Sequence, residues 1–118
     1  FLFFFVAFSC LFFSLHAQTP AIHRYTVKDG LPSNEVYDVI QDRQGFIWFA
    51  TENGVAQFDG SQFTTLTMRD GLPDNTVYKL YEDAVGRIWF LPLHGLPVYY
   101  KDFHIHFYYC LIIFLLIF

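Results

Sequence analysis

Short apolar and aromatic runs, separated by turns that contain glycine, fill the charged middle of the chain. One series occupies residues 36–41, 46–51, 55–58 and 63–67 and is rich in Val, Ile, Phe, Trp and Thr, which favour β-strands. Residues 46–51 are apolar on both faces, as expected of a strand covered by neighbouring sheets on both sides. The Asn53-Gly54 pair in one of the turns favours a type I′ hairpin. The pattern predicts four short antiparallel strands joined as a meander.

The same series returns 41 residues later. Residues 28–58 and 69–99 are identical at 13 of 31 positions without a gap. The returning strands are predicted at 77–82, 88–91 and 98–100, and Pro92 and Pro97 shorten them because proline cannot donate to a β-ladder. We expect a fourth strand at 105–109, unless it is lost to an altered tail. Repeats of this length with one tryptophan each are typical of β-propeller blades.

A further β-type run, residues 22–27, precedes the first unit and aligns with residues 63–68 at the same offset. Residues 22–27 therefore correspond to the last strand of a unit, but no other strands of such a unit precede them. We hypothesise that this strand closes a propeller ring by joining the final blade. The Asp-Gly-Leu-Pro connector that follows predicts an extended Leu31 that tucks inward between blades, because the next residue is proline.

Both ends of the chain are apolar, and every Lys, Arg, Asp and Glu lies between Arg24 and Asp102. The apolar run from Leu2 to Leu15 is followed two residues later by a small residue, Ala17. This order predicts a helical signal peptide over residues 1–17. The run is too short for a membrane anchor, and Cys10 does not sit in a lipidation motif because the apolar run continues past it. Since residue 1 is phenylalanine, we interpret the chain as the N-terminal part of a longer protein.

The last apolar block, residues 107–118, is also too short to span a bilayer. Three interpretations of the hydrophobic tail at 103–118 stay open: out-of-frame sequence, a truncated membrane helix, or a buried strand. The repeat pattern stops after Asp102, and the turn of the first unit suggests a glycine where Phe103 stands.

Charge and cysteine content exclude some classes of function. The net charge of −4 is of mixed sign and has no basic stripe, which argues against nucleic-acid binding. After removal of a signal peptide only Cys110 is left, so no internal disulfide is expected.

The two units share the phrase Gly-Leu-Pro-x-Asn-x-Val-Tyr, followed by Asp-x-x-Gly-x-Ile-Trp-Phe and an Asn-Gly or His-Gly pair. In this they resemble the two-component regulator propeller repeat. The second unit departs from the first at Pro92-Leu93-His94. The resemblance rests on Gly30, Leu31, Asn34, Val36, Asp42, Gly45, Ile47, Trp48 and Gly54, with the matching set Gly71, Leu72, Asn75, Val77, Asp83, Gly86, Ile88, Trp89 and Gly95.

The resemblance implies an exported sensor region with many blades, a transmembrane helix and a cytoplasmic kinase or regulator. We expect an all-β fold, a partial β-propeller of about two four-stranded antiparallel blades. The predicted organisation is a signal peptide (1–17), an N-terminal strand (18–28), repeat 1 (29–68), an incomplete repeat 2 (69–102) and the tail (103–118). Such an arc leaves two apolar sheet faces uncovered, so alone it is expected to aggregate or fold loosely.

No catalytic constellation and no metal site are expected. His104 and His106 lie on one strand face but lack further ligands, and the aspartates in the turns, Asp42 and Asp83, are expected to cap those turns rather than bind calcium. Trp48 and Trp89 are expected in the core. The remaining ligand-binding candidates lie near strand ends and loops: Tyr37, Asn53, Tyr78 and His94.

We expect a non-enzymatic, exported ligand-sensing segment of a two-component sensor, acting at the periplasmic face of the inner membrane without a cofactor. Its expected partners are an extracellular ligand such as an oligosaccharide, further propeller blades, and the membrane through a helix of the parent protein. Two alternatives stay open: a free-standing periplasmic or secreted propeller that binds carbohydrate or protein, and a propeller lyase, for which these blades lack acid–base pairs.

Overall fold

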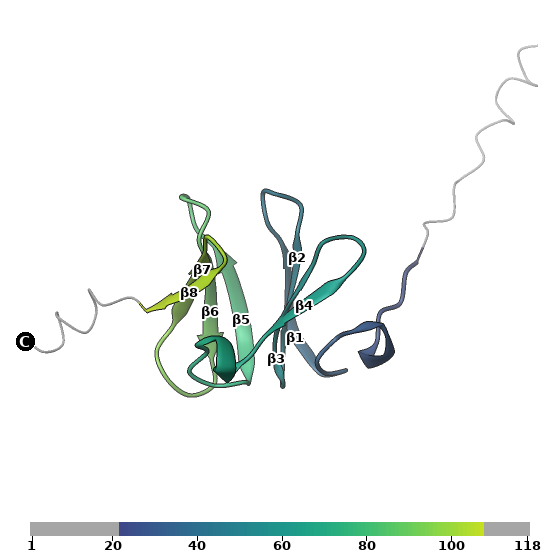
Figure 1. The fold of residues 1–118 in the computed structure, drawn as a ribbon, viewed down its shortest axis with the longest axis horizontal. Helices are drawn as coiled ribbons and strands as arrows, with labels where there is room; N and C mark the ends of the chain where they lie inside the picture. Colours follow the sequence, from purple (N-terminus) through teal and green to yellow (C-terminus); the bar gives the residue numbers. More distant parts are fainter. Residues whose placement is uncertain (1–21, 108–118) are drawn as a thin grey trace, which may run out of the picture.

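The chain folds into two four-stranded antiparallel sheets, which Figure 1 shows side by side. The computed structural model describes residues 22–107. The first sheet has the order β1-β2-β3-β4 and the second β5-β6-β7-β8, so each is a plain meander. The 3-10 turns and strands of the described residues are, in chain order, η2 (Val27–Asp29), β1 (Val36–Gln41), β2 (Ile47–Thr51), β3 (Gly54–Phe58), β4 (Phe63–Leu66), η3 (Met68–Asp70), β5 (Val77–Glu82), β6 (Ile88–Pro92), β7 (Val98–Lys101) and β8 (His104–Phe107).

This architecture confirms the predicted all-β fold with two blades. The first strand of each unit has the predicted bounds. The fourth strand of the second unit is present as β8, which pairs with β7 from Val98↔Phe107 to Lys101↔His104. The second unit therefore extends beyond Asp102 and is complete in strands.

The strand expected at residues 22–27 is absent. Residues 22–26 have no strand partner in the described part of the chain, and the 3-10 turn η2 begins at Val27. Strand-type residues cannot form a strand without a ladder, and β4, at the equivalent place in the repeat, has β3 beside it. Closure of a ring by this segment stays a prediction.

The two connectors fold alike. In η2, Thr26 and Asp29 form a capping box, and Thr67 and Asp70 form the same box in η3. The side chain of Asn34 accepts a hydrogen bond from the backbone N–H of Val27, and Asn75 repeats this contact in η3. Each connector then buries its leucine, Leu31 or Leu72, as the Leu-Pro pair predicts.

The hairpin turns differ from the expectation in one respect. A type I′ turn requires positive φ at both central residues, but among non-glycine residues in 22–107 only Asp102 and Phe103 have positive φ. The Glu52-Asn53 turn is therefore not type I′, and only Gly54 after it is left-handed, with φ 109°. The Asp102-Phe103 turn of β7–β8 has the type I′ signature instead, with φ 53° and 66°.

Replacing Phe103 with glycine is expected to stabilise the protein. The ring of Phe103 is 88% exposed, and its backbone has φ 66°, which a side chain disfavours by about 1 kcal/mol. The Phe103→Gly variant should therefore gain about that much free energy of unfolding in urea denaturation at fixed protein concentration. Phe103→Ala is the matched control, because it removes the ring but keeps the Cβ; an equal gain in both variants would trace the effect to the exposed ring.

The repeat frame shifts by one residue inside the second sheet. In the first sheet Ile47 pairs with Phe58, whereas its counterpart Ile88 pairs with Tyr100. The β6–β7 loop around His94 thus contains one more residue than the β2–β3 turn. Beyond this loop, the structural counterpart of Gln57 is Tyr99 rather than Val98.

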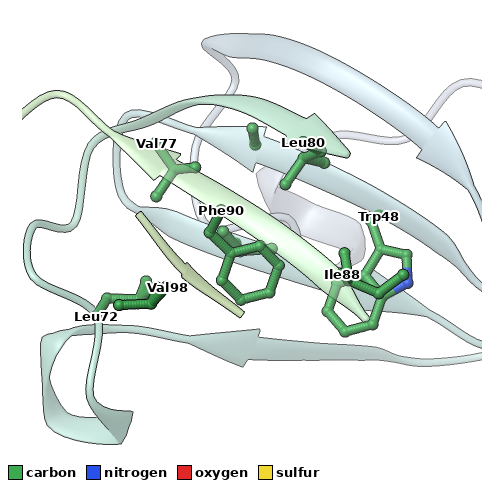
Figure 2. Packing of buried hydrophobic residues seen from close by; sticks show 9 residues of the cluster. Trp48, Leu72, Val77, Leu80, Ile88, Phe90 and Val98 are labelled. Carbon is green, nitrogen blue, oxygen red and sulfur yellow. The ribbon is translucent and has the colours of Figure 1, made fainter. Parts of the chain in front are cut away.

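The core lies between the two sheets (Figure 2). Trp48 is 1% exposed and contacts Phe90 and Tyr100, with ring centroids 5.6 Å and 5.0 Å away. The first sheet contributes Trp48, Ala50 and Val55, and the second contributes Val77, Leu80, Ile88, Phe90 and Val98, with Leu72 from the connector. Each sheet therefore depends on the other for its burial.

The predicted signal peptide (1–17) and the tail residues 108–118 lie outside the described residues. Within residues 22–107, no helix has the length and apolar character to cross a membrane.

Candidate binding groove between the two sheets

One aspartate organises the turn between the first two strands of each sheet. In the first sheet, Oδ1 of Asp42 accepts hydrogen bonds from the backbone N–H groups of Gln44 (2.9 Å) and Phe46 (3.0 Å). Its Oδ2 accepts one from Nε1 of Trp48 at 2.8 Å. Asp42 therefore caps the turn and fixes the ring that fills the core, which confirms the capping role and the core position of Trp48.

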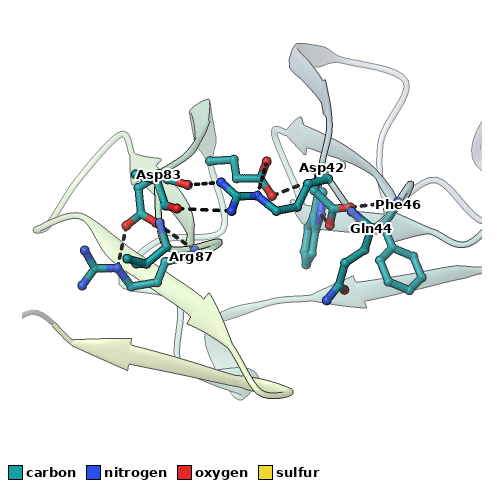
Figure 3. Close-up of polar contacts among 10 residues, drawn as sticks. Asp42, Gln44, Phe46, Asp83 and Arg87 are labelled. Carbon is teal, nitrogen blue, oxygen red and sulfur yellow. Dashed lines mark hydrogen bonds and ion pairs between the residues drawn. The ribbon is translucent and has the colours of Figure 1, made fainter.

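Asp83 repeats the arrangement in the second sheet (Figure 3). Its Oδ1 accepts from the backbone N–H groups of Val85 and Arg87, and its Oδ2 accepts from Nε1 of Trp89 at 2.8 Å and from Nε of Arg87. Loss of solvent alone would raise the pKa of Asp83. The hydrogen bonds from Trp89 and Arg87 outweigh it, so the pKa lies well below its ordinary value.

Stability is expected to fall in acid through this group. Because the pKa of Asp83 is lower in the folded than in the unfolded state, its contribution is fully present above the unfolded value of 3.8 and is lost as the pH falls toward the folded pKa. The free energy of unfolding, measured at several pH values below about 5, should therefore decrease as the pH is lowered. An Asp83→Asn variant should show a shallower decrease; identical slopes would contradict this role of Asp83.

Arg43 connects the two turns across the interface. Its guanidinium donates to the carbonyl oxygens of Asp83 (2.9 Å) and Ala84 (3.2 Å), and its Nε lies 3.6 Å from Oε1 of Glu82. Its backbone N–H also donates to Oε2 of Glu82. In Figure 3, dashed lines mark contacts between the turn that holds Asp42 and the turn that holds Asp83. We call these contacts the Arg43 latch.

A second polar link joins the innermost strands. Oδ2 of Asp38 on β1 accepts a hydrogen bond from the backbone N–H of Leu80 on β5 at 2.9 Å, and Nζ of Lys79 lies 3.6 Å from the same oxygen. At a third place, the backbone N–H of Gly54 donates to the carbonyl oxygen of Asn75, and the hydroxyl of Thr76 donates to the carbonyl oxygen of Glu52. The inter-sheet contact thus combines an apolar centre with polar links at three places.

A groove lies beside the latch, at the end of the molecule where the β1–β2, β5–β6 and β7–β8 turns meet. It consists of two cavities of about 230 and 380 Å³ that share four lining residues from both sheets. The side chains of Gln44, Gln57 and Asp102 make no hydrogen bond to any residue in 22–107. The shared residues are Gln44, Gln57, Tyr100 and Asp102, and Arg43 and Glu82 of the latch also line the smaller cavity.

The ligand-binding residues predicted from the sequence lie at the opposite end and line neither cavity. Tyr37 and Tyr78 sit in matching β-bulges near the starts of β1 and β5, and both are exposed. Asn53 is in the β2–β3 turn, and His94 in the β6–β7 loop has Nδ1 2.9 Å from Oδ2 of Asp74. These four residues share an end of the molecule, but no contact joins the tyrosines to the other two within the described residues.

The groove was missed because its residues differ between the repeats. Gln44 and Gln57 come from the first unit, and Tyr100 and Asp102 from the second, so a search for matching motifs passes over all four. Of the two histidines in His104-x-His106, His106 stacks on the ring of Tyr99.

Comparison with known proteins identifies the same two repeats. The family model of the two component regulator propeller matches residues 30–53 and 71–91, one segment in each sheet. Histidine kinase P4 of Formosa agariphila is 38% identical over 60 residues, which are 49% of this chain and 4% of that protein.

A solved structure is also similar: the extracellular domain of a hybrid two-component system from B. thetaiotaomicron, with a TM-score of 0.65 and 30% identity. The match covers 73% of this chain and 13% of that one, so this chain spans a small part of either relative. The repeated sequence, the two matching sheets and these similarities agree: each sheet contains one segment that matches the two component regulator propeller repeat.

Proposed function

We propose that the chain is an exported, ligand-sensing propeller segment of a two-component sensor whose kinase lies outside the 118 residues. The observation that supports this most is the likeness to the extracellular domain of a hybrid two-component system, at 30% identity over 73% of the chain. The kinase relative in F. agariphila is consistent with the same arrangement.

In this proposal the groove is the ligand site. It is concave, both sheets line it, and it offers two amides and a carboxylate that the described residues leave without hydrogen bonds. The half-buried ring of Tyr100 adds an apolar surface with a hydroxyl group. Planar amides, a carboxylate and an aromatic ring together suit the alternating hydroxyl and C–H surfaces of an oligosaccharide.

The position of the groove suggests how occupancy is transmitted. Arg43 and Glu82 line the groove and also form the latch between the sheets. A ligand that binds one arrangement of the sheets better than another shifts the population toward that arrangement. The groove can therefore couple ligand binding to the relative placement of neighbouring blades, and through them to membrane-proximal parts of a parent protein.

Binding is tested with the full chain and a panel of neutral and acidic oligosaccharides, by calorimetry and by the shift in melting temperature. Asp102→Asn and Gln57→Ala alter the groove, and asparagine tolerates the left-handed backbone at position 102. We expect either change to weaken binding about tenfold or more, and Tyr78→Ala at the opposite end to leave it unchanged. Loss of binding in Tyr78→Ala alone would move the site to the residues predicted from the sequence, and no binding of any panel member would contradict an oligosaccharide ligand.

Export is tested separately with alkaline phosphatase fused after residue 107, because this enzyme is active only outside the cytoplasm. We expect activity from the full fusion and a loss of activity when residues 1–17 are deleted. Equal activity in both fusions would contradict a signal peptide at these residues.

A further inference from the structure

A third cavity continues the groove beyond Tyr100. Its volume is about 180 Å³, and it lies between the end of β4 with η3 and the β7–β8 hairpin. Tyr100 and Phe103 line this cavity as well as the larger cavity of the groove, and Tyr100 lines all three. The three cavities therefore follow one path past Tyr100, from Arg43 in the latch to His104 and Asp70.

The size of the third cavity argues against an independent site. Pockets that enclose a drug-sized ligand have volumes of about 300–1,000 Å³. A cavity of about 180 Å³ is smaller than this range, but as a continuation of the groove it can hold one further part of a longer ligand. A path through three neighbouring cavities suits a linear chain of similar units better than a compact molecule.

The lining of the third cavity combines apolar and polar side chains. Leu66 and Ile105 are partly buried and pack against the core, whereas Asp70 and His104 are exposed. Oδ2 of Asp70 accepts a hydrogen bond from the backbone N–H of Thr67 at 2.9 Å, which holds the carboxylate in place. Within residues 22–107, Oδ1 of Asp70 and the imidazole of His104 make no hydrogen bond, so both can bond to hydroxyl groups of a ligand.

Charge distinguishes the three cavities. Arg43 and Lys101 line the smaller cavity of the groove, but within residues 22–107 no lysine or arginine lines the larger cavity or the third one. Carboxylates line these two instead: Asp59 and Asp102 in the larger cavity, and Asp70 in the third. An anionic group of a ligand would meet like charge there and no cation to compensate it, which is unfavourable.

We propose that the ligand of the groove is a linear, uncharged oligosaccharide that extends through all three cavities, with its end unit bound by His104 and Asp70. This inference rests on the proposed function of the groove and narrows its ligand class. Hydroxyl groups of the end unit bond to the imidazole and the carboxylate, and its C–H surface packs on the aromatic rings of Tyr100 and Phe103. An acidic unit is accepted only beside Arg43.

The test measures binding of the full chain to neutral linear oligosaccharides, from a disaccharide to a hexasaccharide. Calorimetry is done at about pH 8, where an ordinary imidazole carries no charge. We expect the affinity to rise about tenfold once the oligosaccharide is long enough to reach the third cavity, and then to level off. His104→Ala should remove this rise and leave the binding of shorter oligosaccharides as it is, whereas His104→Gln, which keeps a hydrogen-bonding group, should retain part of the rise.

The matched control is His94→Ala, because His94 is also exposed but lies at the opposite end of the molecule. This variant should bind oligosaccharides of every length like the unmodified chain. Equal affinity for short and long oligosaccharides, with Asp102→Asn weakening both, would leave the groove as a ligand site but overturn its extension into the third cavity. Absence of binding at every length would instead contradict the proposed function, and this inference with it.

The preference for an uncharged ligand is tested with oligosaccharides of matched length that have a carboxylate on every unit. We expect them to bind about tenfold or more weakly than the neutral series, and the difference to shrink as salt is added, because salt screens the repulsion. Equal or tighter binding of the acidic series would overturn the uncharged ligand class.

Discussion

Replacing Trp48 with alanine is expected to lower the free energy of unfolding by about 3–5 kcal/mol, whereas the same change at Trp89 should cost about 2 kcal/mol or less. The two residues hold the same place in the repeat, and each donates its indole N–H to the aspartate of its own turn. They differ in burial: Trp48 is enclosed between the sheets, and Trp89 is only partly buried in residues 22–107.

Urea denaturation at fixed protein concentration measures both variants, because any association between copies adds to the apparent stability. Trp48→Phe serves as the control, since it retains most of the apolar volume and removes the hydrogen bond to Asp42. Equal losses for Trp48→Ala and Trp89→Ala would mean that both faces are equally covered in solution.

Replacing Gly54 with alanine is the second large effect expected, a loss of about 3 kcal/mol or more. Gly54 has φ 109°, which disfavours any side chain, and an added Cβ would collide with the carbonyl oxygen of Leu66, the last residue of the neighbouring strand β4. Because this carbonyl belongs to the backbone, it cannot move aside without disturbing the end of β4.

Gly45 provides the matched control for this change. Its φ of 95° is similar, but nothing lies within 4 Å of an added Cβ. Gly45→Ala should therefore show only the cost of the left-handed backbone, about 1 kcal/mol. The difference between the two variants, measured as the shift in denaturation midpoint, reports the collision alone; similar shifts would contradict it.

Most of the fold could be predicted from the repeat pattern, because the positions that match between the units are those that determine the structure of a blade. The aspartates that cap the turns and the leucines of the connectors take the roles that their chemistry predicts, and so does Trp48 in the core; Trp89, predicted to be in the core as well, is only partly buried in residues 22–107. A meander needs only local pairing, and local pairing is what alternating residues and turns that contain glycine encode.

The remaining features depend on contacts that a repeat pattern does not encode. Residues 22–27 have strand-type side chains, but a strand also requires a partner, and none is present in the described residues. The extra residue in the β6–β7 loop is invisible in an ungapped alignment, yet it sets which side chain neighbours Trp89. The groove combines residues that differ between the units, so only the packing of one sheet on the other shows that they meet.

The Arg43 latch gives the two units distinct positions in the chain. Arginine belongs to the first unit, and the carbonyl groups that receive it, together with Glu82, belong to the second. In a polypeptide with the two units exchanged, Ala84 would occupy the donor position, and no guanidinium would reach across the boundary. The two units are therefore not interchangeable. A protein with the units in the reverse order would keep both sheets but lose the contacts of the Arg43 latch.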